Sequence, residues 1–319
     1  MHRLRNWQLF AICVLTWGTT WYAVTYQVTP IAPEFGVALR FGLAGVLVVA
    51  GCALRGLRLR FTLRDHALFA FQGVFLYGLA YVGIYYAERH IASGLVAVGY
   101  SASPLITGLG AWALFGVAAS RRFVLGGALG IAGVALIFWP EFGNARHGAE
   151  VGLGAALTVA SVVLSAVGSL AASRNRPRGL PFWPGLGYGM LYGALACLAV
   201  GLTRGAAMTL PASASWWLSL LYLVLAGSVL TFACFLTLQD RIGPGPTGAV
   251  GVMTPLLALL VSVALEGYRP DAYTAAGAVL AVFGNVLMLG RGARKRPVPT
   301  ADAASARQGP HFVAGAAGD

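Results

Sequence analysis

Charged side chains are scarce in this sequence. Asp, Glu, Lys and Arg together make up 10% of its 319 residues, whereas hydrophobic residues make up 58%. A typical soluble domain carries about 25% charged residues, so a chain of this composition cannot cover a water-facing surface. Uninterrupted apolar runs approach the ~20 residues that a membrane-spanning helix needs. The composition therefore excludes a soluble fold and predicts an all-α transmembrane protein.

Motifs that carry catalysis are also missing. The sequence contains no phosphate-binding Walker loop, no His-Glu-x-x-His motif and no Cys-x-x-Cys pair. We therefore predict no catalytic residue, no metal site and no cofactor, and we expect that the protein is not an enzyme. Two alternatives stay open: a membrane-embedded enzyme that acts on lipid, and a membrane scaffold without transport activity.

What the sequence has instead is a series of apolar runs separated by short turns. Ten spans are predicted, at about 7–26, 33–54, 66–86, 92–115, 121–139, 151–172, 182–203, 216–238, 244–265 and 270–290. Most basic residues lie in the turns on one side of these spans, and basic loops stay in the cytoplasm. These basic residues give the chain its net charge of +12. Their distribution predicts a multi-pass protein of the cell inner membrane with both termini cytoplasmic. We expect the protein to lie in the lipid bilayer and not to bind nucleic acid.

Two of the runs contain a central proline, and the two prolines are related by an internal repeat. Pro104 and Pro255 differ by 255 − 104 = 151 positions, and the same offset pairs Pro33 with Pro184. Gly116 and other residues also recur at this offset. The sequence therefore predicts two five-helix repeats, 1–140 and 150–296, followed by a disordered cytoplasmic tail at 297–319. Because five is odd, the second repeat has inverted topology, and the expected fold is a ten-helix bundle of the kind found in secondary transporters.

The paired prolines fall near the middle of the fourth and ninth predicted spans. A proline in a helix frees a carbonyl one turn earlier, and interrupted helices at matching positions of two repeats point to a substrate site. The alternative is a packing kink without ligand contact. Nearby hydroxyls could bind a polar ligand or satisfy their own backbone. The candidates around these breaks are Tyr100, Ser101, Ser103, Pro104, Met253, Thr254 and Pro255.

Four stretches carry a family resemblance. They are LTWGTTWYAV (15–24), PEFGVALRFGLAG (33–45), SGLVAVGYSASPLITGLGAWALFG (93–116) and IGPGPTGAVGVMTPLLALLVSVALEGY (242–268). In order and spacing they resemble the EamA-type permeases of the drug/metabolite transporter (DMT) superfamily. The family often has Gly-Glu at the ends of the fourth and ninth helices, where this chain has Gly116-Val117 and Gly267-Tyr268. A structural role is therefore the more plausible one for Glu266.

The resemblance implies a layout and a function. Helices one to four and six to nine would enclose a central cavity, and helices five and ten would lie at the periphery, where they could support a homodimer. Such a permease moves a small organic solute by alternating access. For this chain we expect an amino acid or a similar metabolite, with export as the expected direction.

A few side chains within the spans are candidates for the cavity wall. Arg40 is a basic residue inside a span, where a charge is costly unless it meets water, a partner or a ligand. It could hold a substrate anion, or it could pair with Glu34 or Glu88 and shape the fold. Trp17 lies near mid-membrane and could form an apolar wall. One helical face carries Tyr77, Tyr81 and Tyr85.

Energy coupling has no obvious carrier in the sequence. A buried carboxylate is the usual proton carrier in transporters, yet no Asp or Glu falls at the expected centre of a span. Glu34 and Glu88 are therefore the coupling candidates, and passive, facilitated export is the alternative. Weaker cavity candidates are Ser165 and Ser169.

Overall fold

The computed structural model describes residues 4–29, 31–116, 120–142, 148–175, 179–206, 208–242, 247 and 249–289. Regular secondary structure within these ranges is helical throughout. Six helical segments are long and apolar enough to cross a membrane, and two shorter apolar helices follow near the C-terminal end. The predicted all-α, membrane-spanning class is therefore confirmed. The predicted tail at 297–319 lies outside the described residues.

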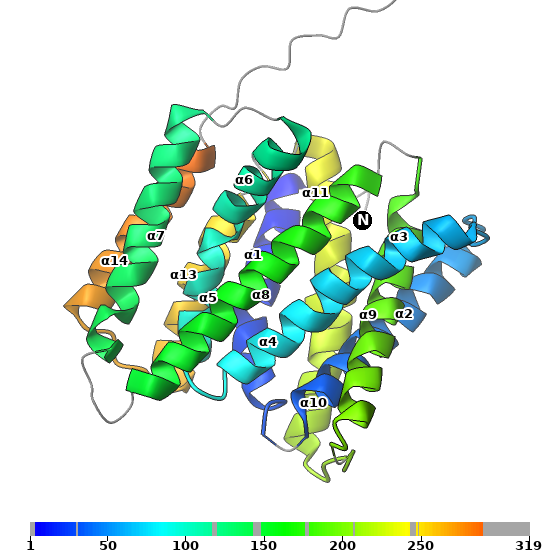
Figure 1. Ribbon diagram of the computed structural model, residues 1–319, viewed down its shortest axis with the longest axis horizontal. Helices are drawn as coiled ribbons and strands as arrows, with labels where there is room; N and C mark the ends of the chain where they lie inside the picture. The colour runs from blue at the N-terminus through cyan, green and yellow to red at the C-terminus, as the bar shows by residue number, and fades with distance from the viewer. Residues whose placement is uncertain are drawn as a thin grey trace, which may run out of the picture.

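The helices follow one another through short connections and pack side by side (Figure 1). In chain order they are α1 (Asn6–Thr25), α2 (Pro33–Leu54), α3 (Leu63–Gly73), η1 (Val74–Leu79), α4 (Ala80–Ala87), α5 (Ser93–Gly99), η2 (Tyr100–Ala102), α6 (Ser103–Phe115), α7 (Arg121–Phe142), α8 (Gly148–Asn175), α9 (Phe182–Thr203), α10 (Ala214–Tyr222), η4 (Leu223–Leu230), α11 (Thr231–Ile242), α13 (Ala249–Leu265) and α14 (Ala272–Leu289). The segments η1, η2 and η4 directly adjoin the α-helices on either side. Three continuous rods are therefore composite: α3–η1–α4, α5–η2–α6 and α10–η4–α11.

Local sequence explains several helix ends. Pro33 occupies the first turn of α2, where its missing N–H would have no partner in any case. The Thr62 hydroxyl accepts a hydrogen bond from the Asp65 N–H, and the Asp65 carboxylate accepts one from the Thr62 N–H, which together cap α3. Gly116 and Gly267 follow the last turns of α6 and α13 with φ of 66° and 69°, a left-handed conformation that favours glycine.

The composite rods depart from α-helical geometry in different ways. The segments η1 and η4 are π-helical, whereas η2 is a short 3₁₀ turn. Pro104 lies in the first turn of α6, directly after η2, so the predicted interruption of the fourth span is observed. Pro255 lies inside α13, which continues through it. The prediction of a matching interruption at Pro255 is therefore wrong, because the surrounding helix tolerates the lost hydrogen bond.

Glycines allow pairs of helices to approach closely. Along the contact between α7 and α14, a Cβ added at Gly126 would overlap the carbonyl oxygen of Gly284. A Cβ at Gly193 of α9 would lie 2.7 Å from the carbonyl oxygen of Gly73, so α9 packs closely against the rod that contains α3 and η1. In Figure 1, α7 and α14 form one end of the bundle and α2, α3 and α9 the other. The helices α1, α5 and α13 lie between them and frame the site described next.

Candidate functional site

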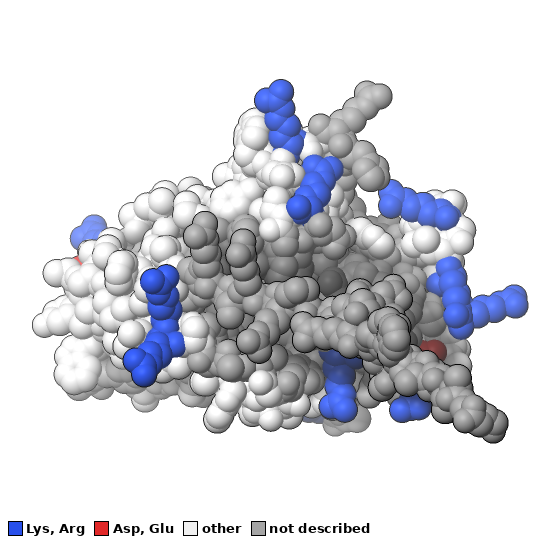
Figure 2. Space-filling view, turned by 90° about the horizontal axis from the view of Figure 1, so that it is seen from above, with Lys and Arg blue, Asp and Glu red and all other residues white. Residues whose placement is uncertain are grey.

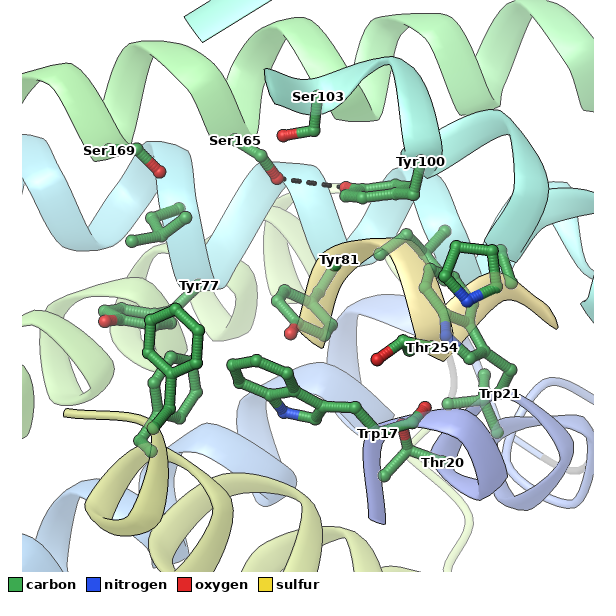
Figure 3. A pocket seen from close by; sticks show the side chains of 18 of the residues that line it. Trp17, Thr20, Trp21, Tyr77, Tyr81, Tyr100, Ser103, Ser165, Ser169 and Thr254 are labelled. Atoms are coloured by element: carbon green, nitrogen blue, oxygen red, sulfur yellow. Dashed lines mark hydrogen bonds between the residues drawn. The ribbon is translucent and has the colours of Figure 1, made fainter. Parts of the chain in front are cut away.

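A cavity of about 370 Å³ lies in the middle of the bundle. Its walls come from both the first and the second half of the chain, as Figure 3 shows for the labelled side chains. Nine of the twelve predicted cavity residues line it: Trp17, Arg40, Tyr77, Tyr81, Tyr100, Ser103, Pro104, Thr254 and Pro255. The structure thus brings these residues together, and their role in binding stays a prediction.

Aromatic rings form one wall of the cavity. The Trp17 indole nitrogen donates to the Gly227 carbonyl oxygen at 3.1 Å, which fixes the ring across the gap between α1 and η4. The Trp17 ring lies 5.4 Å from that of Phe232 and 5.2 Å from that of Phe235, between centroids. Because its N–H is already bonded, Trp17 offers the cavity an apolar ring face.

Hydroxyl groups line another wall (Figure 3). The Tyr100 hydroxyl and the Ser165 hydroxyl are 3.0 Å apart, and Ser103 and Ser169 also line the cavity. The Thr254 hydroxyl donates to the Val250 carbonyl oxygen at 2.8 Å within its own helix. Thr254 therefore satisfies a backbone carbonyl, which was the alternative to ligand binding. The serine and tyrosine hydroxyls are the better placed groups for a polar solute.

Arg40 supplies the positive charge of the cavity. Its side chain is 2% exposed, and its Nε donates to the Ser228 hydroxyl at 3.3 Å. The guanidinium carbon lies 4.9 Å from the centre of the Tyr81 ring and 5.0 Å from that of Phe41. Among the described residues no carboxylate lies within 4.0 Å of it. Since arginine stays protonated, this buried cation, which forms no salt bridge with a described carboxylate, is suited to hold an anion.

Glu34 has partners other than Arg40. The Arg204 Nη1 donates to the Glu34 Oε1 at 2.9 Å, and the Tyr86 hydroxyl donates to the same oxygen at 3.0 Å. The proposed ion pair between Glu34 and Arg40 is therefore wrong. The reason is geometric, because six residues separate them on α2 and turn their side chains roughly 120° apart.

Glu88 is buried, and neither of its carboxylate oxygens has a hydrogen-bond partner among the described residues. It directly follows the apolar segment Leu63–Ala87 and caps the end of α4. Burial, and next the nearby charge of Glu266, raise the pKa of Glu88 well above its ordinary value, while Arg40 opposes the shift. Of the two coupling candidates, Glu88 is therefore the one whose carboxylate no described hydrogen bond or ion pair holds.

Glu266 joins the ends of two helices. The Ser93 N–H and the Ser262 hydroxyl donate to its Oε2 at 3.1 and 2.8 Å, and the Ser93 hydroxyl donates to its Oε1. These bonds connect the start of α5 to the end of α13. They agree with the structural role expected for this residue.

Three predicted cavity residues lie elsewhere. Tyr85 is fully buried, and its ring approaches Gly36 of α2. Ser101 lines a separate small cavity together with Asn285, and the Met253 side chain is 43% exposed. None of the three lines the central cavity. Helix rotation is the cause, since eight residues turn Tyr85 roughly 80° away from Tyr77.

Part of the wall was missed by sequence reasoning. On α1, Thr20, Trp21 and Val24 line the cavity beside Trp17. Their spacing of i+3, i+4 and i+7 from Trp17 marks one helix face, and this signal could have found them. Phe232 is the counterpart of Tyr81 at the repeat offset of 151, and Phe235 follows it by three residues on the same face of α11, so the internal repeat could have found both. Ser165 and Ser169, the weaker candidates, do line the cavity.

Comparison with known proteins assigns the chain to a family. The EamA-like transporter family matches it twice, over residues 6–139 and 152–290. The chain belongs to the EamA-like transporter family. It is therefore a membrane transport protein of the DMT superfamily.

Individual relatives of this EamA-like transporter agree with that assignment. The "Uncharacterized inner membrane transporter YedA" of Escherichia coli strain K12 is 28% identical over 267 residues, which cover 81% of this chain and 82% of YedA. The protein PecM of Dickeya dadantii strain 3937 is 25% identical over 263 residues, covering 81% of this chain and 83% of PecM. A solved crystal structure of another protein covers 88% of this chain and 94% of its own, with a TM-score of 0.65 and 20% identity, and shares the fold.

Proposed function

We propose that this EamA-like transporter exports a small organic solute, an amino acid or a similar metabolite, by alternating access. The observation that carries the proposal is the central cavity, where aromatic rings and hydroxyls surround an arginine that forms no salt bridge with any described carboxylate. Arg40 would hold the carboxylate of the solute, and Trp17 would face its apolar part. A cavity of about 370 Å³ is within the usual size range of small-molecule sites, roughly 300–1,000 Å³.

Alternating access in this proposal uses two inverted five-helix repeats, residues 1–140 and 150–296, in a ten-helix bundle. The double family match supports the two repeats. So do the paired positions of η1 and η4, which interrupt the third rod of each repeat with π-helical turns. The contacts between helices are also repeated. The first helix of the first repeat, α1, packs on the fourth helix of the second repeat, α13, and the first helix of the second repeat, α8, packs on the fourth rod of the first, α5 and α6. An odd number of spans in each repeat would orient the two copies oppositely.

We further propose that both termini are cytoplasmic, in the inner membrane. Figure 2 looks down on the upper side of Figure 1 and shows basic side chains around this face with few acidic ones. The exposed residues Arg58, Arg60 and Arg64 precede or begin α3 and would lie in the cytoplasm. A homodimer would use α7 and α14, since Val279 and Phe283 of α14 are exposed.

Coupling in this proposal belongs to Glu88. Glu34 is held by Arg204 and Tyr86, whereas the Glu88 carboxylate is buried and makes no hydrogen bond within the part of the chain that the structure describes. Arg40 and Glu266 both act on Glu88 electrostatically. A solute anion on Arg40 would remove the positive field that favours ionised Glu88, so binding of solute and proton would be linked.

The test is an export screen with a blocked cavity. Gly251 lines the cavity, and a Cβ added there meets nothing within 4 Å, so Gly251→Phe fills the cavity without a backbone clash. Cells that overproduce the wild type should raise at least one external metabolite, measured by mass spectrometry of the medium. Gly251→Phe should lose this increase, and the control Leu195→Phe, on an exposed face of α9 away from the cavity, should keep it. Equal export by Gly251→Phe and wild type would disprove transport through this cavity.

A further inference from the structure

A second cavity, of about 750 Å³, lies outside the substrate site. It is formed by the C-terminal half of α2, the first turn of α9, and η4 with α11. None of the residues that line it lines the central cavity. We call it the α2–α11 groove.

Most of the α2–α11 groove is apolar and open to the side. Leu47, Val48 and Cys52 of α2 face Leu225 and Val229 across it. Leu47 is 45% and Leu225 46% exposed, as expected of side chains that meet lipid in a membrane protein. From Leu47 to Arg55, α2 rises by about 12 Å, close to the ~15 Å depth of one leaflet of the hydrocarbon core. The groove therefore has the depth and the lining that an acyl chain requires.

One end of the groove is positively charged. Arg55 follows the last residue of α2, and Arg241 lies in the last turn of α11, so both guanidinium groups stand at the same end. Arg55 is exposed, and within the described part of the chain its guanidinium makes no hydrogen bond or ion pair. Arg241 donates to the Leu4 carbonyl oxygen at 2.6 Å and so also anchors the start of α1. Trp183, whose amphipathic ring suits a membrane interface, lines this cavity too.

An anion is the ligand that this end of the groove suits. No described acidic side chain lines the groove, whereas two arginines do. Guanidinium groups bind phosphate oxygens with paired hydrogen bonds, and basic pockets between membrane helices bind anionic headgroups. A free anion would leave the apolar length of the groove unfilled, whereas a phospholipid would occupy both parts.

We propose that the α2–α11 groove is a binding site for one anionic phospholipid. Its phosphate lies at Arg55 and Arg241, and one acyl chain lies between α2 and the η4–α11 rod. This site does not depend on the solute that the permease carries.

The groove also touches the rod that supports the central site. Leu225, Val229 and Leu230 line it from η4. The neighbouring η4 residues Gly227 and Ser228 accept the hydrogen bonds from Trp17 and Arg40. Bound lipid therefore packs against the opposite side of the segment that positions the two candidate solute-binding side chains.

The test measures lipid binding to the purified, delipidated full-length protein by native mass spectrometry. Dioleoylphosphatidylglycerol is titrated against dioleoylphosphatidylcholine. The wild type should retain one phosphatidylglycerol with at least about tenfold preference over phosphatidylcholine. Arg55→Gln should reduce that preference about fivefold. The control Arg64→Gln removes an exposed arginine that does not line the groove and should leave the preference unchanged.

A second variant tests the apolar part. Gly51 lines the groove, and a Cβ there meets nothing within 4 Å, so Gly51→Phe blocks the groove with little strain. It should lose the bound lipid while its Tm stays close to that of wild type. Equal binding of both lipids, an equal effect of Arg64→Gln and Arg55→Gln, or a retained lipid in a folded Gly51→Phe would each overturn the proposal. If Gly51→Phe does not fold, the comparison of Arg55→Gln with Arg64→Gln tests the proposal by itself.

Discussion

The two halves of this transporter place different chemistry on corresponding helices. In the first half, the second and third rods carry Arg40, Tyr77 and Tyr81, all on the central cavity. At the offset of 151, their counterparts in the second half are Leu191, Ser228 and Phe232. The first half thus supplies the charge and the phenolic hydroxyls, and the second half supplies mainly apolar surface.

The difference shows how a repeated scaffold can serve one asymmetric solute. Leu191 lies in the contact between α9 and α2, where a Cβ added at Gly45 would lie 2.8 Å from it. Ser228 accepts the hydrogen bond from the Arg40 Nε. Leu191 and Ser228 therefore pack and position, and Phe232 adds an apolar ring to the cavity wall, whereas the first-half residues bring the charge and the phenolic hydroxyls to the cavity. A solute with one charged and one apolar end would bind in a single orientation.

The largest effect is expected from making the two halves alike at Arg40. Arg40→Leu introduces the residue found at the corresponding position of the second half and removes the buried cation. If Arg40 holds the solute carboxylate, export should fall about 100-fold, the loss expected when one partner of a buried charge pair is removed. Efflux of the metabolite found in the export screen, from loaded proteoliposomes, measures it.

Arg40→Lys is the matched control, because it keeps the charge but loses the planar fork. It should retain part of the efflux that Arg40→Leu loses. Unchanged efflux in a folded Arg40→Leu would show that the arginine is structural, and the asymmetry would then have no bearing on the solute.

The sequence predicted those features that depend on composition and on long apolar runs. The positions of α2 and α9 were predicted to the residue, because Pro33 marks the start of α2 and apolar runs of 22 residues define both helices. Arg40 stood out because a cation inside an apolar run is rare. These signals need no knowledge of how the helices are rotated.

Features that depend on helix rotation were not predictable. Tyr85, Ser101 and Met253 lie near residues that line the central cavity, yet none of the three lines it. One residue turns a helix by about 100°, and the π-helical and 3₁₀ segments η1 and η2 change this rotation locally. The partner of Glu34 is also long-range, because Arg204 is 170 residues away in the sequence.

Substitutions of the two buried carboxylates of the first half, Glu88 and Glu34, should have smaller effects that differ from each other. Because the pKa of Glu88 is raised in the folded protein, its ionisation costs stability as the pH rises above its unfolded value of about 4.3. Glu88→Gln should therefore raise the Tm at pH 8, with a gain that shrinks toward pH 5, and should flatten the pH dependence of export. Differential scanning fluorimetry in detergent and proteoliposome efflux at both pH values measure this.

Glu34→Gln is the comparison for Glu88→Gln. Its salt bridge joins a side chain that is 2% exposed to an Arg204 side chain that is 63% exposed, so solvent screens it. Glu34→Gln should lower the Tm by about 2–4 °C at neutral pH and leave the pH dependence of export unchanged. If Glu34→Gln flattens that dependence and Glu88→Gln does not, the assignment of coupling to Glu88 is wrong.

The smallest effect concerns the two prolines, which have the same place in each repeat but different surroundings. Pro104 follows the 3₁₀ turn η2, so Pro104→Ala supplies an N–H that lets α5 and α6 merge and rotates Tyr100 and Ser103 on the cavity wall. Pro255 lies inside a continuous α13, so Pro255→Ala restores a hydrogen bond without moving the wall. Export should slow roughly three- to tenfold in Pro104→Ala, whereas Pro255→Ala should stay within about twofold and gain thermal stability, since an interior proline costs a helix up to ~3 kcal/mol. Equal slowing by both substitutions would mean that the interruption serves transport symmetrically, and the contrast between the halves would then lie in Arg40 and the tyrosines alone.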